Sequence, residues 1–250
     1  DMSYVAPARN LLEYGVFGTG QKPTTTRPIG YSLFLATMMW CFGTYWLPAT
    51  LIVQAAAAAV IYPALGVMAL VFLGQQARRT MRRTMVFVLI AGTYWAMLGW
   101  LYSDGLFTAL LTAGLAWTVH AAARRQWTGI LLGGLCIAAA GSVRPVLMAY
   151  GFIHPLFIMA AMRTAEPHEH PAGSADRSYL MMTAVMSVIV LTISGFAPAV
   201  RNAVNHGRFI QSGILPLRMS HYVAKPIYAE AGREDLIAQM NRDIDRSEPA

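Results

Sequence analysis

Five charged residues stand apart from the apolar background of this sequence and could carry chemistry. They are two carboxylates and three arginines: Asp1, Asp104, Arg27, Arg144 and Arg201. A carboxylate can accept a proton, and a guanidinium group can bind phosphate oxygens through two parallel hydrogen bonds. Charges close to a membrane that topology does not explain are candidate functional residues. What these five can do depends on the elements that position them.

The composition predicts an integral membrane protein. Of the 250 residues, 56% are hydrophobic and 12% are charged, whereas a soluble domain carries about a quarter charged residues. Arginines occur in tight groups, Arg78-Arg79, Arg82-Arg83 and Arg124-Arg125, with apolar runs between them. This pattern is typical of spans joined by short loops. The net charge of +7 then fits arginines facing anionic lipid headgroups and does not call for a nucleic-acid partner.

The fold class expected is all-α, a polytopic transmembrane bundle with interfacial amphipathic helices. Apolar runs long enough for spans occur about six times, at residues 49–73, 85–102, 105–122, 127–142, 146–162 and 179–199. We expect three regions: an outer loop with interfacial helices at 1–48, the bundle at 49–200, and the start of an exoplasmic segment at 201–250. The chain begins at Asp1 rather than at methionine, so we expect it to be a fragment of a longer protein.

The first region is predicted to lie at the membrane surface. Tyr4, Ala8, Leu11 and Leu12 would share one face of a short amphipathic helix that ends at the glycines from Gly15 onward. The apolar run at residues 30–46 is short and is interrupted by glycine and proline. It predicts either a second interfacial or re-entrant helix or a span, with equal weight.

Arginine placement predicts the orientation. The groups at Arg78 to Arg83, at Arg124-Arg125, and at Arg163 with Arg177 fall in alternate loops. Placing those loops in the cytoplasm follows the positive-inside rule. Under this choice the five charged residues named first all lie at exoplasmic ends of helices.

Each of these residues also has a plain structural interpretation. Arg144 could be an arginine that extends to the interface, although Pro145 makes a defined break after it and broken helices usually line a cavity. Asp104 is the only acidic residue between Glu13 and Glu166, and it could simply be the N-cap of a helix that starts at Gly105. Arg201, taken alone, would be a helix-end arginine.

The histidines and cysteines favour structural roles. His168-Glu169-His170 matches no metal-ligand spacing and is interpreted as part of a solvated loop. His154, in an apolar run, is interpreted as a hydrogen-bonded core histidine. Cys41 and Cys136 both lie in apolar stretches and are interpreted as small buried hydrophobic residues.

Five short motifs, in order along the chain, resemble the GT-C superfamily of membrane glycosyltransferases. The nearest branch is the bacterial protein-mannosyltransferase-like and aminoarabinose-transferase-like group. The motifs are Asp1-Met2-Ser3-Tyr4 with Ala8-Arg9-Asn10-Leu11-Leu12, Arg27-Pro28-Ile29-Gly30-Tyr31, Ser103-Asp104-Gly105, Val143-Arg144-Pro145, and Pro198-Ala199-Val200-Arg201-Asn202. Asp104 stands where this family usually has glutamate.

The resemblance implies transfer of a sugar from a polyprenyl-phosphate donor to a protein, lipid or glycan acceptor, with inversion at the anomeric carbon. It implies a multi-pass protein of a bacterial inner or plasma membrane, within the cell envelope, whose site is exoplasmic. No cofactor is implied. The donor is a lipid-linked sugar phosphate. Departure of its lipid monophosphate neither demands nor excludes a divalent metal.

The roles that follow from the resemblance are specific. Asp1 would be the catalytic base for the acceptor hydroxyl. Arg144 and Arg201 would bind the donor phosphate, with Arg27 a weaker candidate. Asp104 would orient an arginine or the acceptor loop, and Tyr4 and Tyr31 would support the site.

Two other classes of protein remain open on the sequence. Broken helices and charges at membrane depth also occur in transporters and flippases. A membrane protein that keeps this fold without catalysis is the third possibility. Convergence of Asp1, Arg144 and Arg201 on one outward-facing cavity would favour the enzyme.

Overall fold

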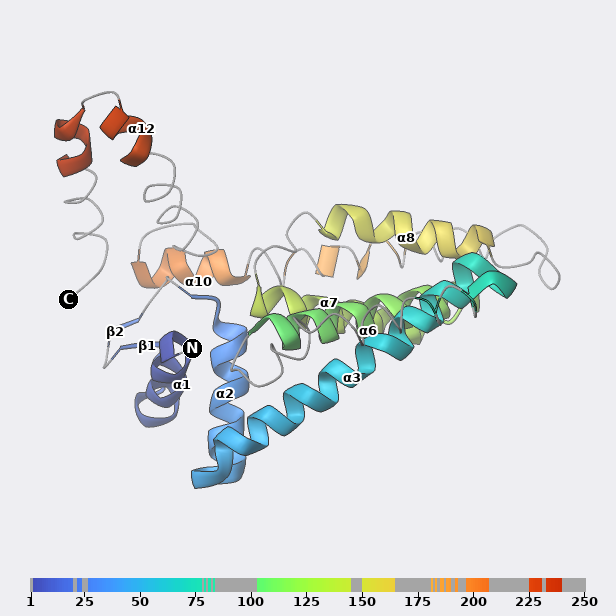
Figure 1. The fold of residues 1–250 in the computed structure, drawn as a ribbon, viewed down its shortest axis with the longest axis horizontal. Coiled ribbons are helices and arrows are strands. Elements are labelled where there is room, and N and C mark those ends of the chain that lie inside the picture. Colours follow the sequence, from blue (N-terminus) through green and yellow to red (C-terminus); the bar gives the residue numbers. More distant parts are fainter. Residues whose placement is uncertain are drawn as a thin grey trace.

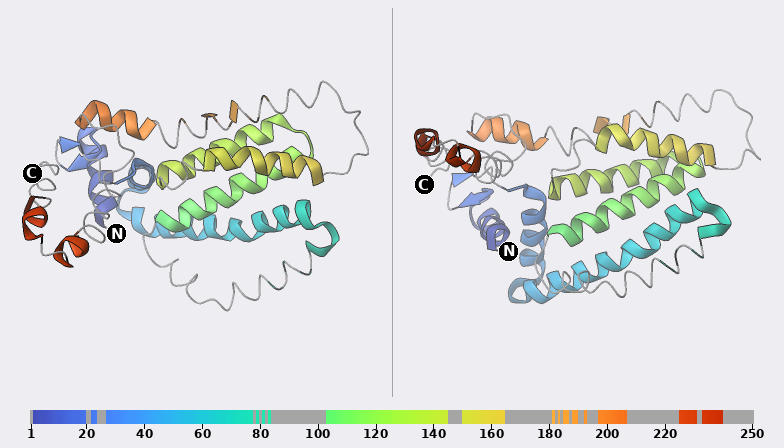
Figure 2. Two further views of the ribbon diagram at one scale, coloured as in Figure 1. Left: turned by 90° about the horizontal axis from the view of Figure 1, so that it is seen from above. Right: turned by 45° about the horizontal axis from the view of Figure 1, so that its top comes forward.

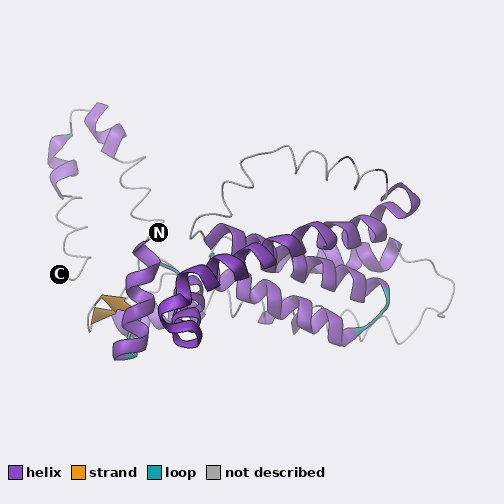
Figure 3. Cartoon of the chain, turned by 60° about the horizontal axis from the view of Figure 1, so that its bottom comes forward, coloured by secondary structure: helices purple, strands orange, loops and turns teal. Residues whose placement is uncertain are grey.

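The computed structural model describes residues 2–19, 22–23, 27–77, 103–144, 150–164, 197–206, 225–230 and 233–239, and single residues within 79–83 and 181–192. Within these residues the chain is helical apart from one pair of two-residue strands (Figure 3). The predicted all-helical class is therefore confirmed for the described part, with this hairpin as the exception. The elements are α1 (Met2–Tyr14), β1 (Gly18–Thr19), β2 (Lys22–Pro23), α2 (Ile29–Phe42), η1 (Gly43–Tyr45), α3 (Trp46–Leu73), η2 (Gly74–Gln76), α6 (Ser103–Ala123), α7 (Trp127–Val143), α8 (Tyr150–Thr164), α10 (Ala197–His206) and α12 (Lys225–Glu230).

The long helices form a bundle. Helices α3, α6, α7 and α8 run along the long direction of the molecule, and α6 packs against the other three (Figures 1 and 2). Two stretches, Ile29–Leu73 and Ser103–Ala123, are long and apolar enough to cross a membrane, and α7 is a shorter apolar helix. The predicted spans at 49–73, 105–122, 127–142 and 146–162 fall on the helices α3, α6, α7 and α8, of which α3 and α6 belong to the two stretches long enough to cross. Those at 85–102 and, for most of its length, 179–199 lie outside the described residues.

Helix α2 runs across the bundle rather than along it (Figure 1). It has 14 residues, which makes it about 21 Å long, less than the roughly 30 Å of a bilayer core. Gly43, with φ of 52°, ends it and donates its N–H to the carbonyl of Met39. This left-handed conformation suits glycine and separates α2 from α3. The length of α2 alone is short for a span, and the choice between an interfacial or re-entrant helix and a span at residues 30–46 stays a prediction.

Packing of α6 on α7 relies on small residues. A Cβ atom added to Gly114 would lie 2.8 Å from the carbonyl oxygen of Gly133, and one added to Gly129 would lie 2.5 Å from the Cβ of Ala121. The two backbones therefore approach too closely for larger side chains. Close backbone contact through small residues is typical of helices that associate in a lipid bilayer, because the hydrophobic effect does not drive helices together there.

The turn between α6 and α7 is a Schellman motif. The N–H of Gln126 donates to the carbonyl of Ala121 at 2.8 Å, and the N–H of Arg125 donates to that of Ala122 at 3.1 Å. Arg125 has φ of 54°, so it adopts the left-handed conformation that glycine normally supplies at this position. This turn brings the end of α7 back beside the start of α6.

Helix α1 ends where the sequence predicts, but one residue of its predicted buried face is exposed. Helix α1 does end at Gly15, whose φ is 70° and whose N–H donates to the carbonyl of Leu11 at 3.1 Å. Leu12, however, is 46% exposed, whereas Tyr4 and Ala8 are buried. The prediction that Leu12 shares their face was wrong, because residues 4, 8 and 11 already fill the face that packs on α2.

Candidate functional site

Asp104 and Arg144 form an ion pair at one end of the bundle. Asp104 lies in the first turn of α6, and Arg144 is the residue at which α7 ends. A guanidinium nitrogen of Arg144 contacts a carboxylate oxygen of Asp104, and the two side chains are 40% and 36% exposed. Because α6 already includes Ser103, the prediction that Asp104 caps a helix starting at Gly105 was wrong. Its carboxylate is directed to Arg144 instead.

This ion pair contributes little to stability and much to position. Pairs with this exposure are worth about 0–1 kcal/mol. The carboxylate nevertheless fixes one side of a group that carries five N–H donors. The guanidinium carries more donors than this one contact uses, and a guanidinium already held in place loses less entropy when it binds an anion.

The N-terminus of α2 packs directly against the end of α7. At Gly30 an added Cβ would lie 2.5 Å from the carbonyl carbon of Ser142. The buried cluster beside this contact, named the four-helix cluster, joins four helices. It consists of Tyr4, Val5, Ala8, Tyr31, Leu35, Ala36, Leu106 and Val143. Leu106 follows Asp104 by two residues, and Val143 directly precedes Arg144. The ion pair therefore borders this cluster.

The sequence motif around Arg27 meets the motif around Tyr4. The guanidinium carbon of Arg27 lies 5.2 Å from the centroid of the Tyr4 ring, within the range of a cation–π contact. The Tyr4 and Tyr31 rings meet edge to face, with centroids 5.0 Å apart. The hydroxyl of Ser32 donates to the carbonyl of Tyr4 at 3.1 Å. Helix α1 is thereby attached to α2 at the four-helix cluster.

One residue of this network, Gln54, was missed by the sequence analysis. It lies on α3, is 4% exposed, and its Nε2 donates to the hydroxyl of Tyr31 at 3.0 Å. The available signal was its composition, since Gln54 is the only amide side chain in the 28 residues of α3. Polar groups in apolar helices normally face a partner.

Arg201 contacts the short segment that follows α1. Its guanidinium carbon lies 4.9 Å from the centroid of the Phe17 ring, and it donates to Asn202 Oδ1 at 3.1 Å from Nε and 2.7 Å from Nη2. Asn10 of α1 donates to the carbonyl of Val16 and so holds this segment against α1. Burial lowers the pKa of Arg201, because loss of solvent disfavours its charged form. An anion beside Arg201 would offset this effect by favouring the charged form.

The structure thus pairs Asp104 with Arg144 and brings Arg27, Tyr4 and Tyr31 together at the adjoining cluster. Arg201 reaches this region through Phe17 and α1. The proposed base, Asp1, lies outside the described residues and directly precedes α1 in the sequence.

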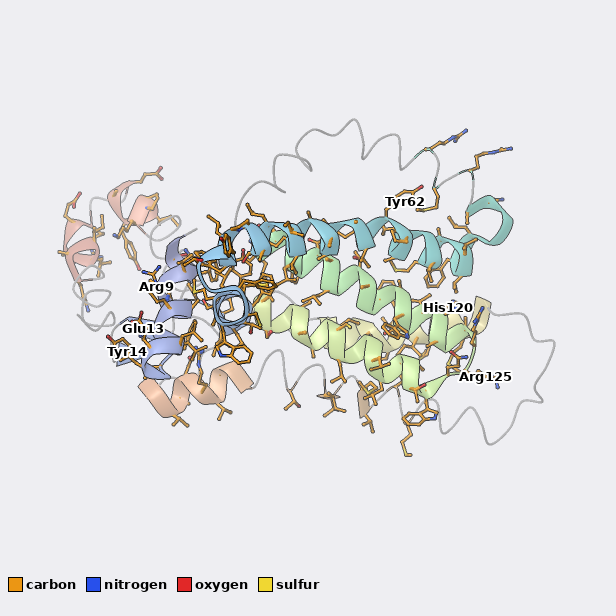
Figure 4. All side chains as sticks on the ribbon, turned by 90° about the horizontal axis from the view of Figure 1, so that it is seen from below. Arg9, Glu13, Tyr14, Tyr62, His120 and Arg125 are labelled. Carbon is orange, nitrogen blue, oxygen red and sulfur yellow. The ribbon has the colours of Figure 1, made fainter. Side chains whose placement is uncertain are left out.

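The opposite end of the bundle carries other charges. Figure 4 shows His120 and Arg125 at the end farthest from Arg9 and Glu13 of α1. The described residues contain no group of three or more histidine, cysteine or acidic side chains that could hold a metal ion. His168, Glu169 and His170 lie outside the described residues.

Comparison of the chain with protein-family models, with curated proteins and with solved structures gives no match.

Proposed function

We propose that this chain is part of a GT-C-like membrane glycosyltransferase. It would move a sugar from a polyprenyl-phosphate donor to a protein, lipid or glycan acceptor on the exoplasmic face of a bacterial plasma membrane. The observation that carries the proposal is the half-exposed ion pair of Arg144 with Asp104, beside the cluster to which Arg27 is attached through Tyr4. Two guanidinium groups at one end of an apolar bundle suit a phosphate that is anchored by a lipid tail.

The reaction would proceed in one displacement. The carboxylate of Asp1 takes the proton of the acceptor hydroxyl, and the acceptor oxygen forms a bond to the anomeric carbon from the face opposite the phosphate. The bond from that carbon to the phosphate oxygen breaks, and the electron pair leaves with the lipid monophosphate. Arg144 and Arg27 stabilise the charge that develops on its oxygens, with Arg201 as a further ligand.

The remaining contacts have supporting roles in this scheme. Asp104 holds the Arg144 guanidinium in position before the donor binds. Tyr4 provides the aromatic ring on which Arg27 rests, and Tyr31 packs against that ring edge to face. This scheme does not demand a divalent metal, because the leaving group is a phosphate held by arginines, and it does not exclude one.

The test uses the full-length protein that contains this chain, reconstituted in vesicles with labelled polyprenyl-phosphate sugars and a mixture of acceptors. Arg144→Ala and Asp104→Asn should reduce transfer by about 100-fold or more, since losing one positioned electrostatic contact has roughly that effect. Asp235→Asn is the matched control, because it removes the exposed Arg233–Asp235 ion pair in another part of the chain.

Three outcomes separate the classes of protein. Covalent transfer that depends on Arg144 supports the proposal. Movement of the labelled lipid across the vesicle membrane without transfer would assign the chain to the transporter or flippase class. Full transfer activity in Arg144→Ala protein that has inserted normally would refute the assigned phosphate site.

A further inference from the structure

A continuous series of contacts links the interior of α3 to the arginine beside the proposed site. It begins at Gln54, which is buried and donates to the Tyr31 hydroxyl at 3.0 Å. Tyr31, with no exposed surface, meets Tyr4 edge to face. The face of the Tyr4 ring carries the guanidinium of Arg27. Each member lies on a different segment, so the series connects α3, α2, α1 and Arg27, which precedes the first residue of α2 by two positions.

The geometry leaves little freedom along this series. Two of its rings are almost entirely buried, Tyr31 at 0% and Tyr4 at 6% exposed, and Ser32 fixes the Tyr4 backbone through its carbonyl. A displacement of the Tyr31 ring therefore moves the Tyr4 ring, and with it the surface under Arg27. Closely packed interiors transmit such shifts rather than absorb them.

We propose that Gln54 is a positioning residue for the donor-phosphate site. Its hydrogen bond sets the rotation and depth of Tyr31, and through Tyr4 it sets where Arg27 and the start of α1 lie relative to Arg144. This inference rests on the proposed function for the identity of the ligand. The coupling of Gln54 to α1 and Arg27 is a property of the fold and can be tested without activity.

The first measurement is hydrogen exchange of the full-length protein in nanodiscs. In Gln54→Leu the amides of α1 should exchange about two- to tenfold faster, which corresponds to the loss of one ordinary hydrogen bond. The control is the same substitution at Gln76, which is exposed in η2 at the other end of α3 and should leave α1 unchanged. Unchanged exchange of α1 in Gln54→Leu would overturn the proposal, whatever the protein catalyses.

The second measurement separates positioning from general stability. Gln54→Leu should raise the KM for a polyprenyl-phosphate sugar about two- to tenfold at an unchanged kcat, and the thermal midpoint should fall by no more than the loss of one hydrogen bond explains. Gln54→Glu should restore the KM, because a buried, neutral carboxylic acid can donate the same bond. Loss of kcat and of thermal stability together, with no rescue by Gln54→Glu, would overturn the proposal in favour of a structural role. If the wild-type protein transfers no sugar while α1 still responds to Gln54→Leu, the proposed function fails and the coupling stands.

Discussion

Replacement of Gly30 by alanine tests how closely α2 must approach α7 for the site to form. A Cβ atom at position 30 would lie 2.5 Å from the carbonyl carbon of Ser142 and 2.6 Å from its oxygen. Ordinary contacts between carbon atoms are about 3.5–4.0 Å, so α2 would have to move by about 1 Å. Backbone atoms cannot rotate out of the way as a side chain can.

Both stability and activity should respond to this shift. Overpacking of a close contact costs about 1–3 kcal/mol, and a displacement of about 1 Å at a site can reduce a rate by about 100-fold. Unfolding by SDS in mixed micelles measures the first effect, and transfer from a labelled polyprenyl-phosphate sugar measures the second.

Two controls make the test specific. Gly105→Ala adds the same methyl group where no atom lies within 4 Å, and it should leave stability unchanged or raise it slightly through helix propensity. The double variant Gly30→Ala with Ser142→Gly removes the serine hydroxymethyl group but keeps the backbone, so it should not restore stability. Equal stability of the Gly30 and Gly105 variants, or full rescue by Ser142→Gly, would refute the reasoning.

Other regions give further predictions. Gly133→Ala should lower the free energy of unfolding by about 1–3 kcal/mol, because its Cβ would lie 2.7 Å from a backbone oxygen of α6; Gly66→Ala, where the nearest atom is a methionine methyl at 3.5 Å, should not. Arg125→Gly should raise the free energy of unfolding by about 1 kcal/mol in the same SDS assay, since it relieves a left-handed conformation. Hydrogen bonding to Arg233 lowers the pKa of Asp235 to about 2. The contribution of ionised Asp235 to folding stability is therefore present above the ordinary carboxylate pKa and is lost as the pH falls towards 2. In Arg233→Gln, an NMR titration should show the titration midpoint of Asp235 rising to near 4.

The helices were largely predictable because their limits are marked in the sequence. Gly15 ends α1, and the arginine pair at Arg124-Arg125 separates α6 from α7 as expected. Apolar runs of this length define helices without reference to their neighbours. Some boundaries differ from the prediction by a few residues. Helix α3 begins at Trp46 rather than at residue 49, directly after η1.

The partners of polar side chains were harder to predict. Asp104 could equally cap its own helix or pair with a residue on another, and only the return of α7 beside α6 decides between them. Gln54 has no sequence neighbour that suggests Tyr31, which precedes it by 23 residues. Arg201 contacts Phe17 because α10 lies close to the segment that follows α1. No periodic pattern in the sequence predicts this contact. Contacts between elements depend on packing, which a one-dimensional pattern does not specify.

The bend at Gly43 also bears on how the chain enters a membrane during synthesis. The stretch Ile29–Leu73 has 45 residues and no acidic or basic side chain, so its composition offers the insertion machinery no charge with which to choose one segment. As a straight helix it would be about 68 Å long, more than twice the thickness of the hydrocarbon core. The left-handed glycine divides it into one piece too short to cross and one long enough. In a bilayer, one backbone conformation at Gly43, rather than a charged residue, would thus decide which part of this stretch spans the hydrocarbon core.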